Sequence, residues 1–181
     1  PPGSPLVHSL DDLAEAAADL WEAHPQLGRA VVKLNEGISG EGNAPLELAP
    51  LELAGCSAAE RRQRLRTAIE HLPMPPPQWR DLVVQQGALV EAWLDGGEAL
   101  SSPSVQGTIH PGGTVEILST HEQILGGLSG QTYLGCRFPA EDAYRLELMR
   151  HGRAVGEALA AEGALERYAV DFIARRFDAQ W

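Results

Sequence analysis

The chain has 181 residues, 44% of them hydrophobic and 22% charged, which is enough for one domain or for two small lobes with a real core. Its 25 acidic residues outnumber 14 basic ones and leave a net charge of −11, which argues against nucleic-acid binding and against adhesion to anionic membranes, because both require excess positive charge. No apolar run approaches the ~20 residues of a membrane span, and no secretory signal precedes the first predicted helix.

The first half of the chain predicts helices alternating with strands. Pro50 interrupts the period-2 pattern LELAPLEL and indicates an edge position or a bulge. Ser57 is a candidate N-cap for the second helix, whose four arginines we interpret as a solvated face. In chain order we predict a helix over 10–24, a buried strand over 30–34, a half-buried strand over 46–53, a helix over 58–72 and a short helix over 79–86.

The second half is richer in strands. The tripeptide PGG at 111–113 predicts a hairpin turn. Residues 117–140 are polar and rich in glycine, and they predict a long functional loop. We predict strands over 88–94, 105–110 and 114–119, a long helix from Pro139 to about Glu162, and a final strand over 167–175.

Separate groups of strands and helices predict an α+β fold with two lobes rather than a doubly wound sheet. The proline-rich segment 73–77 divides the chain into two halves. We therefore predict a first α+β lobe segment over residues 1–72, a connector with a short helix over 73–87, and a second α+β lobe over 88–181.

The stretch RAVVKLNEGISGEGNAP, residues 29–45, is the most informative part of the chain. A buried strand ends in a lysine, and a loop of glycines and small polar residues follows at once. Glycines let backbone N–H groups turn toward an anion at close range, and a lysine supplies a point charge for the same anion. The spacing matches neither G-x-x-x-x-G-K-[ST] nor G-x-G-x-x-G, and a plain hairpin turn is the alternative. The residues that would hold the anion are Lys33, Gly37, Ser39, Gly40, Gly42 and Asn43.

Three acidic residues further along the chain are candidates for the same site. In GALVEAWLDGGEAL, backbone groups after the strand acid Glu91 can pair with a purine edge, and Glu98 beyond the turn can hold ribose hydroxyls. Solvated glutamates around a hairpin are the alternative. Asp171, in the strand-like YAVDFIA, can ligate Mg²⁺, which prefers carboxylate and phosphate oxygens. An ordinary outward strand position is its alternative.

Further polar residues lie within the predicted loop 117–140. His121 can act as a base or contact a substrate, and Arg137 can bind a carboxylate or phosphate in a bidentate manner. A hydrogen-bonded histidine and a structural ion pair are the alternatives. Cys136 stands beside apolar residues without an evident activating partner, so we interpret it as a packed thiol rather than a nucleophile. Because neither Cys56 nor Cys136 belongs to a C-x-x-C or Cys/His cluster, we expect no zinc site and no disulfide framework, and we predict a cytoplasmic protein.

Taken in chain order, these segments resemble the ATP-grasp superfamily. VVKLNEGISGEGNA resembles its lysine strand and glycine-rich loop, and LVEAWLDGGE resembles its adenine hinge and ribose-binding acid. YAVDFIA is similar to the strand that carries its first metal-binding acid. SVQGTIHPGGTVEILSTHEQILGG and GQTYLGCRFPA resemble, more specifically, ATP-grasp peptide ligases of the pheganomycin-biosynthesis type. The resemblance covers about residues 10–175.

This resemblance implies an ATP-grasp fold with two α+β lobes, and a ligase that joins a carboxylate to an amine through an acyl phosphate. ATP and Mg²⁺ would be its cofactors, and small-molecule or peptide carboxylates and amines its substrates. Lys33 would contact the phosphates beneath the glycine-rich loop, and Asp171 would ligate Mg²⁺. His121 and Arg137 become candidates for the substrate side. The remaining implied nucleotide contacts are the segment Glu91, Ala92, Trp93 and Leu94 for adenine and Glu98 for ribose.

The sequence departs from the family pattern in two places. A second metal-binding strand with a Glu-x-Asn pair usually follows the first metal-binding acid, and no such pair precedes Trp181. An arginine often found two residues before that acid is replaced by Ala169. We therefore expect a segment of a larger ligase that by itself binds nucleotide weakly and turns over little. Two alternatives stay open: a nucleotide-binding module without catalysis, and an interaction domain whose glycine loop is only a turn.

Overall fold

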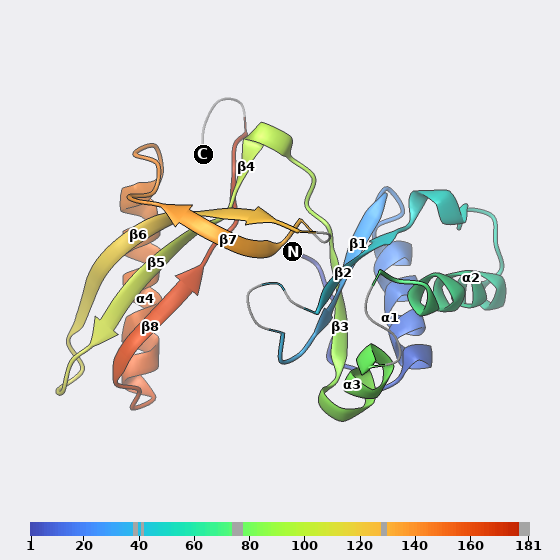
Figure 1. Ribbon diagram of the computed structural model, residues 1–181, viewed down its shortest axis with the longest axis horizontal. Helices are drawn as coiled ribbons and strands as arrows, with labels where there is room; N and C mark the ends of the chain where they lie inside the picture. Colours follow the sequence, from blue (N-terminus) through green and yellow to red (C-terminus); the bar gives the residue numbers. More distant parts are fainter. Residues whose placement is uncertain (38–39, 41, 74–77, 128–129, 178–181) are drawn as a thin grey trace. The chain divides into compact units, whose positions relative to one another are not determined.

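The computed structural model describes residues 1–37, 40, 42–73, 78–127 and 130–177 (Figure 1). The chain folds into two compact units, each with helices and strands, so the predicted α+β class is confirmed. The first unit comprises Pro1–Leu94 and Gly126–Thr132, and the second comprises Asp95–Leu125 and Tyr133–Trp181.

This division differs from the one predicted from the proline-rich segment. We predicted a second lobe from residue 88 onward, but the strand Ala88–Ala92 pairs with the strand Arg29–Leu34 and belongs to the first unit. A strand joins the sheet in which its backbone groups and its apolar face find partners, and Val90 is completely buried there. Residues 126–132 also return to the first unit. Residues 74–77 of the predicted connector lie outside the described residues.

The first unit is an antiparallel three-stranded sheet with helices on one face. Its strands are ordered β2-β1-β3, so β1 lies in the centre. The three helices agree with those predicted from the sequence. Its elements are α1 (Leu10–Ala23), β1 (Arg29–Leu34), β2 (Asn43–Glu47), the 3-10 turn η1 (Ala49–Leu51), α2 (Ala58–Glu70), α3 (Gln78–Gln86) and β3 (Ala88–Ala92).

Local capping fixes where α1 and α2 begin. The Ser9 hydroxyl accepts a hydrogen bond from the backbone N–H of Asp12 at the start of α1. At the start of α2, Ser57 and Glu60 form a reciprocal capping box, as predicted for Ser57. Each cap satisfies N–H groups that the first helical turn leaves without an intrahelical partner.

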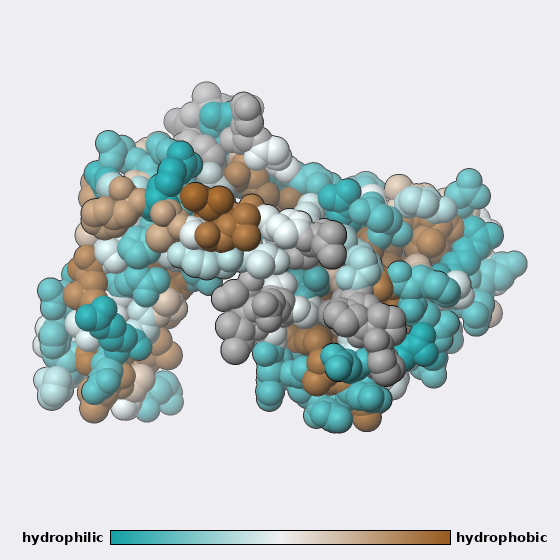
Figure 2. Space-filling view, viewed as in Figure 1, coloured by the Kyte–Doolittle hydropathy of each residue, from teal (hydrophilic) through white to brown (hydrophobic). Residues whose placement is uncertain are grey.

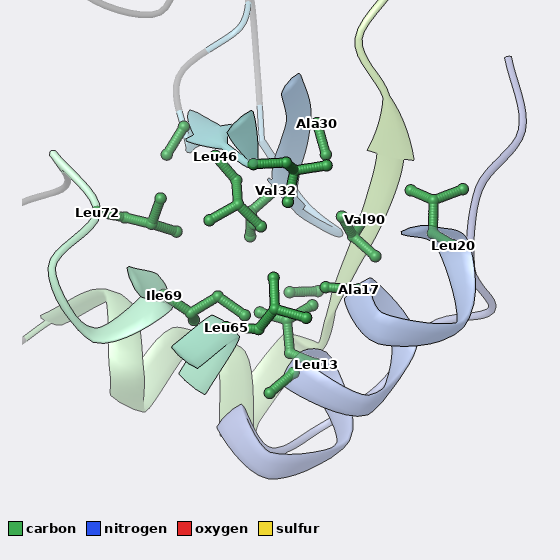
Figure 3. Close-up of a cluster of buried hydrophobic side chains, with 14 of the residues drawn as sticks. Leu13, Ala17, Leu20, Ala30, Val32, Leu46, Leu65, Ile69, Leu72 and Val90 are labelled. Atoms are coloured by element: carbon green, nitrogen blue, oxygen red, sulfur yellow. The ribbon is translucent and has the colours of Figure 1, made fainter. Parts of the chain in front are cut away.

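A large apolar core holds the helices of the first unit against the sheet. Figure 3 shows leucines of α1 and α2 meeting valines of β1 and β3. Alternate positions of β1, namely Ala30, Val32 and Leu34, point into this core, because successive side chains of a strand point to opposite faces. The other face of β1 is thereby left for Arg29, Val31 and Lys33.

The strand predicted over 46–53 is too long. β2 ends at Glu47, and Pro50 lies in the 3-10 turn Ala49–Leu51. Proline has no backbone N–H to donate to a strand ladder, so the chain turns at this point. The alternating apolar pattern of LELAPLEL arises because Leu48 and Leu53, each 2% exposed, reach the core from either side of the turn.

The second unit is built on a four-stranded sheet with one long helix on one face (Figure 1). The strands are ordered β7-β6-β5-β8, and β5 pairs antiparallel with both β6 and β8. Its elements are the 3-10 turn η2 (Gly97–Ala99), β4 (Leu100–Ser101), β5 (Pro103–Ile109), β6 (Val115–Gly126), β7 (Thr132–Arg137), α4 (Arg145–Ala161), β8 (Glu166–Asp171) and β9 (Ala174–Arg175). The predicted PGG turn joins β5 to β6 and is confirmed, with Gly112 and Gly113 both at positive φ.

Three predictions for this unit are wrong in extent. Residues 117–140 are not a long loop, because β6 runs on to Gly126 and β7 returns beside it, which gives the backbone its hydrogen-bond partners. The helix begins at Arg145 rather than at Pro139, after a turn in which Glu141 accepts the N–H of Tyr144. The final strand is divided, because β8 pairs with β5 whereas β9 pairs with β4.

Glycines let α4 lie close to its sheet. A Cβ at Gly152 would come within 2.6 Å of Val105 Cγ1 on β5, and a Cβ at Gly156 would overlap the Tyr168 ring on β8. The small apolar core of this unit consists of Val105, Ala140, Tyr144 and Leu148. One face of the sheet is therefore covered by α4, and the other carries polar side chains.

Candidate functional site

Strand β1 places Lys33 on the face of the first sheet that carries no helices. Lys33 lies opposite Asn43 on β2 and Leu89 on β3. Its ammonium Nζ donates to Glu91 Oε2 at 2.6 Å, and the two side chains are 33% and 25% exposed. The structure thus brings together three residues that we predicted for nucleotide binding: Lys33, Asn43 and Glu91. Lys33 is also the only lysine in the sequence.

The glycine-rich loop packs tightly where its described residues can be followed. Gly40 and Gly42 have φ of +79° and +88°, in the left-handed region that favours glycine. A Cβ on Gly40 would overlap the backbone carbonyl of Gln131, and one on Gly42 would lie 3.2 Å from the Leu34 side chain. The loop begins with a turn in which the N–H of Gly37 donates to the Leu34 carbonyl at 3.3 Å. Ser39 lies outside the described residues.

Gln131 is a neighbour of this loop that the sequence did not reveal. Its side-chain Oε1 accepts a hydrogen bond from Asn43 Nδ2 at 2.6 Å. Gln131 therefore borders the described part of the glycine loop, although it lies 88 residues from Asn43 in the chain. No local sequence pattern predicts the Asn43–Gln131 contact, because it depends on the tertiary position of the segment that follows β6.

The segment after Glu91 forms the end of β3. The backbone N–H of Ala92 donates to Pro2 and that of Trp93 to Arg29, at 2.8 and 3.2 Å. The Trp93 ring lies 5.1 Å from the Arg29 guanidinium, a cation–π distance, and Leu94 is half-buried. In the segment from Glu91 to Leu94, which we predicted to meet adenine, the N–H groups of Ala92 and Trp93 are thus already hydrogen-bonded within the unit.

The second unit carries the other predicted residues on the face of its sheet opposite α4. Ser104 on β5 lies directly between His121 on β6 and Asp171 on β8. Asp171 is exposed, and its Oδ1 accepts a hydrogen bond from Gln123 Nε2 at 2.9 Å. The sheet thus brings His121 and Asp171 to one face. Ser104 and Gln123 were not predicted, and only the strand register reveals them.

The remaining predicted residues are more scattered. Arg137 is exposed at the end of β7, and no ion pair of its guanidinium is found within the described ranges. Glu98 lies in the short turn η2 of the second unit. Cys136 is exposed rather than packed, and its Sγ lies 3.7 Å from His121 Nδ1, so the sequence interpretation of an isolated, packed thiol is wrong.

Asp171 is the one predicted metal ligand, and the part of the chain that the structure describes offers no group of three His, Cys, Asp or Glu side chains that could hold a metal ion. Mg²⁺ takes six oxygen ligands, of which proteins often supply one or two carboxylates. Asp171 therefore stays a predicted metal ligand, and the described residues do not complete a site around it.

Solved structures with the same architecture define the fold. Biotin carboxylase from Campylobacter jejuni matches 97% of this chain and 33% of its own chain, with a TM-score of 0.64 and 17% identity. The biotin carboxylase domain of 2-oxoglutarate carboxylase from Hydrogenobacter thermophilus matches 97% of this chain and 33% of its own, with a TM-score of 0.63 and 16% identity. The chain has the ATP-grasp fold.

Another ATP-grasp structure, D-alanyl-alanine synthetase A from Vibrio cholerae, matches 97% of this chain and 46% of its own, with a TM-score of 0.57 and 14% identity. In sequence, the chain is 38% identical over 172 residues to L-propargylglycine--L-glutamate ligase from Streptantibioticus cattleyicolor. That alignment covers 94% of this chain and 33% of the relative, so the chain spans about one third of its length. No family model matches the sequence.

The ATP-grasp resemblance expected from the motifs is therefore confirmed for the fold. No helix in the described ranges is long and apolar enough to cross a membrane.

Proposed function

We propose that this chain is the nucleotide-binding part of an ATP-dependent ligase that joins a carboxylate to an amine through an acyl phosphate. The observation that carries the proposal is the arrangement around Lys33, where a lysine at the end of a central strand borders a tight glycine loop. The 38% identity to L-propargylglycine--L-glutamate ligase supports amino acids as the substrate class.

ATP fits the residues of the first unit. The Lys33 ammonium supplies positive charge for phosphate oxygens, and Glu91 holds that ammonium against the sheet at 2.6 Å. Gly40 and Gly42 have positive φ, which lets the loop backbone turn its N–H groups toward an anion. The segment from Glu91 to Leu94 would border adenine. Glu98, which belongs to the second unit, is proposed for the ribose.

Mg²⁺ fits only in part, because Asp171 is the one acid in the predicted position and the described residues hold no complete ligand set. When bound, the ion would neutralise charge on the phosphates. His121 and Arg137 are proposed for the substrate side. The two free thiols, Cys56 and Cys136, support the cytoplasmic location predicted from the sequence.

The chemistry that this arrangement serves is phosphoryl transfer followed by acyl transfer. The carboxylate attacks the γ-phosphorus of ATP, the acyl phosphate forms and ADP leaves; the amine then attacks the acyl carbon and phosphate leaves. Charge builds up on the transferring phosphoryl oxygens, and a fixed ammonium stabilises that charge. Positioning of Lys33 by Glu91 is therefore the contribution of this chain's own residues to the first step.

The test uses the fact that Lys33 is the only lysine. An amine-acetylating reagent is applied with and without Mg-ATP, and the modified peptides are measured by mass spectrometry. We expect ATP to protect Lys33, because a bound phosphate covers its ammonium. Equal labelling of Lys33 with and without saturating ATP would contradict the proposal.

Thermal unfolding gives an independent measure of the same site. A ligand at 100 times its dissociation constant stabilises the folded state by about 2.7 kcal/mol. We expect Mg-ATP to raise the melting temperature of the parent and not that of Lys33→Ala. Arg62→Ala is the matched control, since Arg62 also forms a single ion pair, to Glu15 at 2.8 Å, on the surface of α2.

A second candidate function is a nucleotide-binding module without catalysis. It is favoured because the described residues place no group of further metal ligands around Asp171. Binding of ATP without release of ADP, when amino acids are supplied as carboxylate and amine, would support this alternative. The experiment is best done on the chain at the length found in the cell.

A further inference from the structure

The face of the second sheet opposite α4 carries a row of polar side chains that crosses the strands, with Ser104 buried at its centre. His121, Ser104 and Asp171 lie in register on β6, β5 and β8. Cys136 on the neighbouring edge strand β7 extends this row, since its Sγ lies 3.7 Å from His121 Nδ1. A thiol with an imidazole at this distance has a proton acceptor at hand, which a nucleophilic cysteine requires.

The surroundings of the sulfur are accessible and partly apolar. Cys136 is exposed, whereas His121 is half-buried and held edge-on by the Phe138 ring, with 5.8 Å between the ring centroids. A hydrogen bond with Cys136 raises the pKa of the Tyr133 hydroxyl. Figure 2 shows apolar side chains on the surface where β7 lies in Figure 1. Leu134 on β7 is 64% exposed, and Phe138, the residue after β7, is 71% exposed.

The other cysteine, Cys56, is half-buried and has a different hydrogen-bond partner. The thiol of Cys56 donates to the backbone carbonyl of Glu52 at 3.4 Å, at the turn before α2. No imidazole is hydrogen-bonded to it among the described residues. The chain therefore contains two free thiols of which one has a base within reach, and the second serves as an internal control.

We propose that Cys136 and His121 form a nucleophilic thiol–imidazole site that accepts acyl groups from acyl phosphates. The proposal rests on the proposed function for the supply of this donor in the cell, because an acyl phosphate is the intermediate of that reaction. The exposed aromatic and aliphatic side chains beside the sulfur suit the carbon chain of the acyl group.

The step is an acyl transfer without any change of oxidation state. The thiolate sulfur attacks the acyl carbon, the C–S bond forms, the C–O bond to phosphate breaks and inorganic phosphate leaves. His121 Nδ1 takes the thiol proton and returns it to the phosphate or to water. The product is a thioester on Cys136.

The experiment supplies the acyl phosphate directly, as acetyl phosphate, and so does not depend on ATP binding. The protein is incubated with acetyl phosphate, and thioesters on the Cys136 and Cys56 peptides are measured by mass spectrometry, with loss on hydroxylamine treatment as the chemical check. Variants Cys136→Ser, Cys56→Ser and His121→Gln are compared with the parent.

We expect Cys136 to be acetylated about tenfold faster than Cys56, and His121→Gln to lower the Cys136 rate by a similar factor. Equal rates at the two cysteines, or an unchanged rate in His121→Gln, would overturn the proposal. All three tyrosines, Tyr133, Tyr144 and Tyr168, belong to the second unit, so their near-ultraviolet circular dichroism shows whether each variant keeps that unit folded. If His121→Gln unfolds it, His121→Asn gives the same comparison.

The two proposals fail separately. ATP protection of Lys33 without thioester formation would support the proposed ligase function and contradict the proposed thiol site. Thioester formation without ATP protection of Lys33 would support the thiol site and contradict the proposed nucleotide binding.

Discussion

In each unit, one or more helices cover one face of a β-sheet, but the two units differ in the size and composition of the core between helix and sheet. In the first, helices on one face of a three-stranded sheet bury a continuous set of leucines, valines and alanines. In the second, one helix lies on a four-stranded sheet, and its small core includes Tyr144. The second unit therefore depends on close approach through Gly152 and on a buried polar pair, in which the Tyr144 hydroxyl donates to Glu122 Oε2 at 2.6 Å.

This difference shows where each unit has room for chemistry. A sheet with helices on only one face leaves its other face for polar residues, as with Lys33 in the first unit and with His121 and Asp171 in the second. The first unit buries more apolar side chains than the second, and this larger core stabilises the sheet that carries Lys33. We therefore expect core substitutions to cost more stability there.

The largest effect is expected for Leu65→Ala in the core of the first unit, where Leu65 is completely buried. Loss of a buried leucine costs about 3 kcal/mol, from the lost transfer free energy and the cavity left behind. We expect Leu148→Ala, whose parent residue is 5% exposed at the edge of a smaller core, to cost less. Leu146→Ala, at a position 77% exposed, is the control and should change stability by less than about 0.5 kcal/mol.

Chemical denaturation can resolve the two units optically. Trp21, Trp79 and Trp93 belong to the first unit, Trp181 is the last residue of the second, and all tyrosines belong to the second. In a Trp181→Phe background, tryptophan fluorescence should therefore report Leu65→Ala, and tyrosine circular dichroism should report Leu148→Ala. A greater loss for Leu148→Ala than for Leu65→Ala would contradict the comparison.

The next effect is expected for Gly152→Ala on α4. Alanine is the better helix former by about 1 kcal/mol, so an open site would gain stability. Here the added methyl group would press against Val105 Cγ1, 2.6 Å away on a stiff β-branched side chain, and we expect a net loss of about 2 kcal/mol. Ala154→Gly, at an exposed position of the same helix, should lose about 1 kcal/mol. A gain of stability in Gly152→Ala would show that glycine does not set the approach of α4.

A smaller effect, with a distinct pH dependence, is expected for Tyr144→Phe. Phenylalanine would leave Glu122 Oε2 without its donor, and Glu122 Oε1 already has no hydrogen-bond partner among the described residues. We expect a loss of about 1–2 kcal/mol near neutral pH.

The pH dependence follows from the folded-state pKa. Burial, together with the hydrogen bond to Glu122, raises the pKa of Tyr144 from 10.0 to about 12. Because the unfolded chain then loses this proton first, the stabilisation is complete below the ordinary pKa of 10.0 and is lost as pH rises toward about 12. The parent should therefore lose stability between those values more steeply than Tyr144→Phe. Parallel pH profiles for the two proteins would contradict this account of the pair.

The smallest effect on stability is expected at the candidate nucleotide site. Glu91→Gln removes an ion pair between half-buried side chains, and we expect it to cost less than about 1 kcal/mol. Its effect on protection of Lys33 by ATP should be larger than its effect on stability, because the ammonium loses the carboxylate that positions it. A loss of stability as large as that of Leu65→Ala would mean that the pair is structural.

The local signals in the sequence determined much of the secondary structure. Ser57 and Glu60 predict the start of α2, and PGG predicts the β5–β6 turn, because capping and turn formation depend on residues a few positions apart. The lysine strand and the glycine loop were likewise visible, since a strand and the loop after it are continuous in the chain. These same motifs were enough to indicate the ATP-grasp fold.

Only the tertiary structure decided which residues meet. The ion pair of Lys33 with Glu91, the bond from Asn43 to Gln131 and the approach of Cys136 to His121 span 58, 88 and 15 residues. Each depends on strand register and on where a chain segment returns, and no pattern over a few residues fixes either. The sequence therefore determined which chemical groups are present, and the folding of distant segments together determined which of them can act on one another.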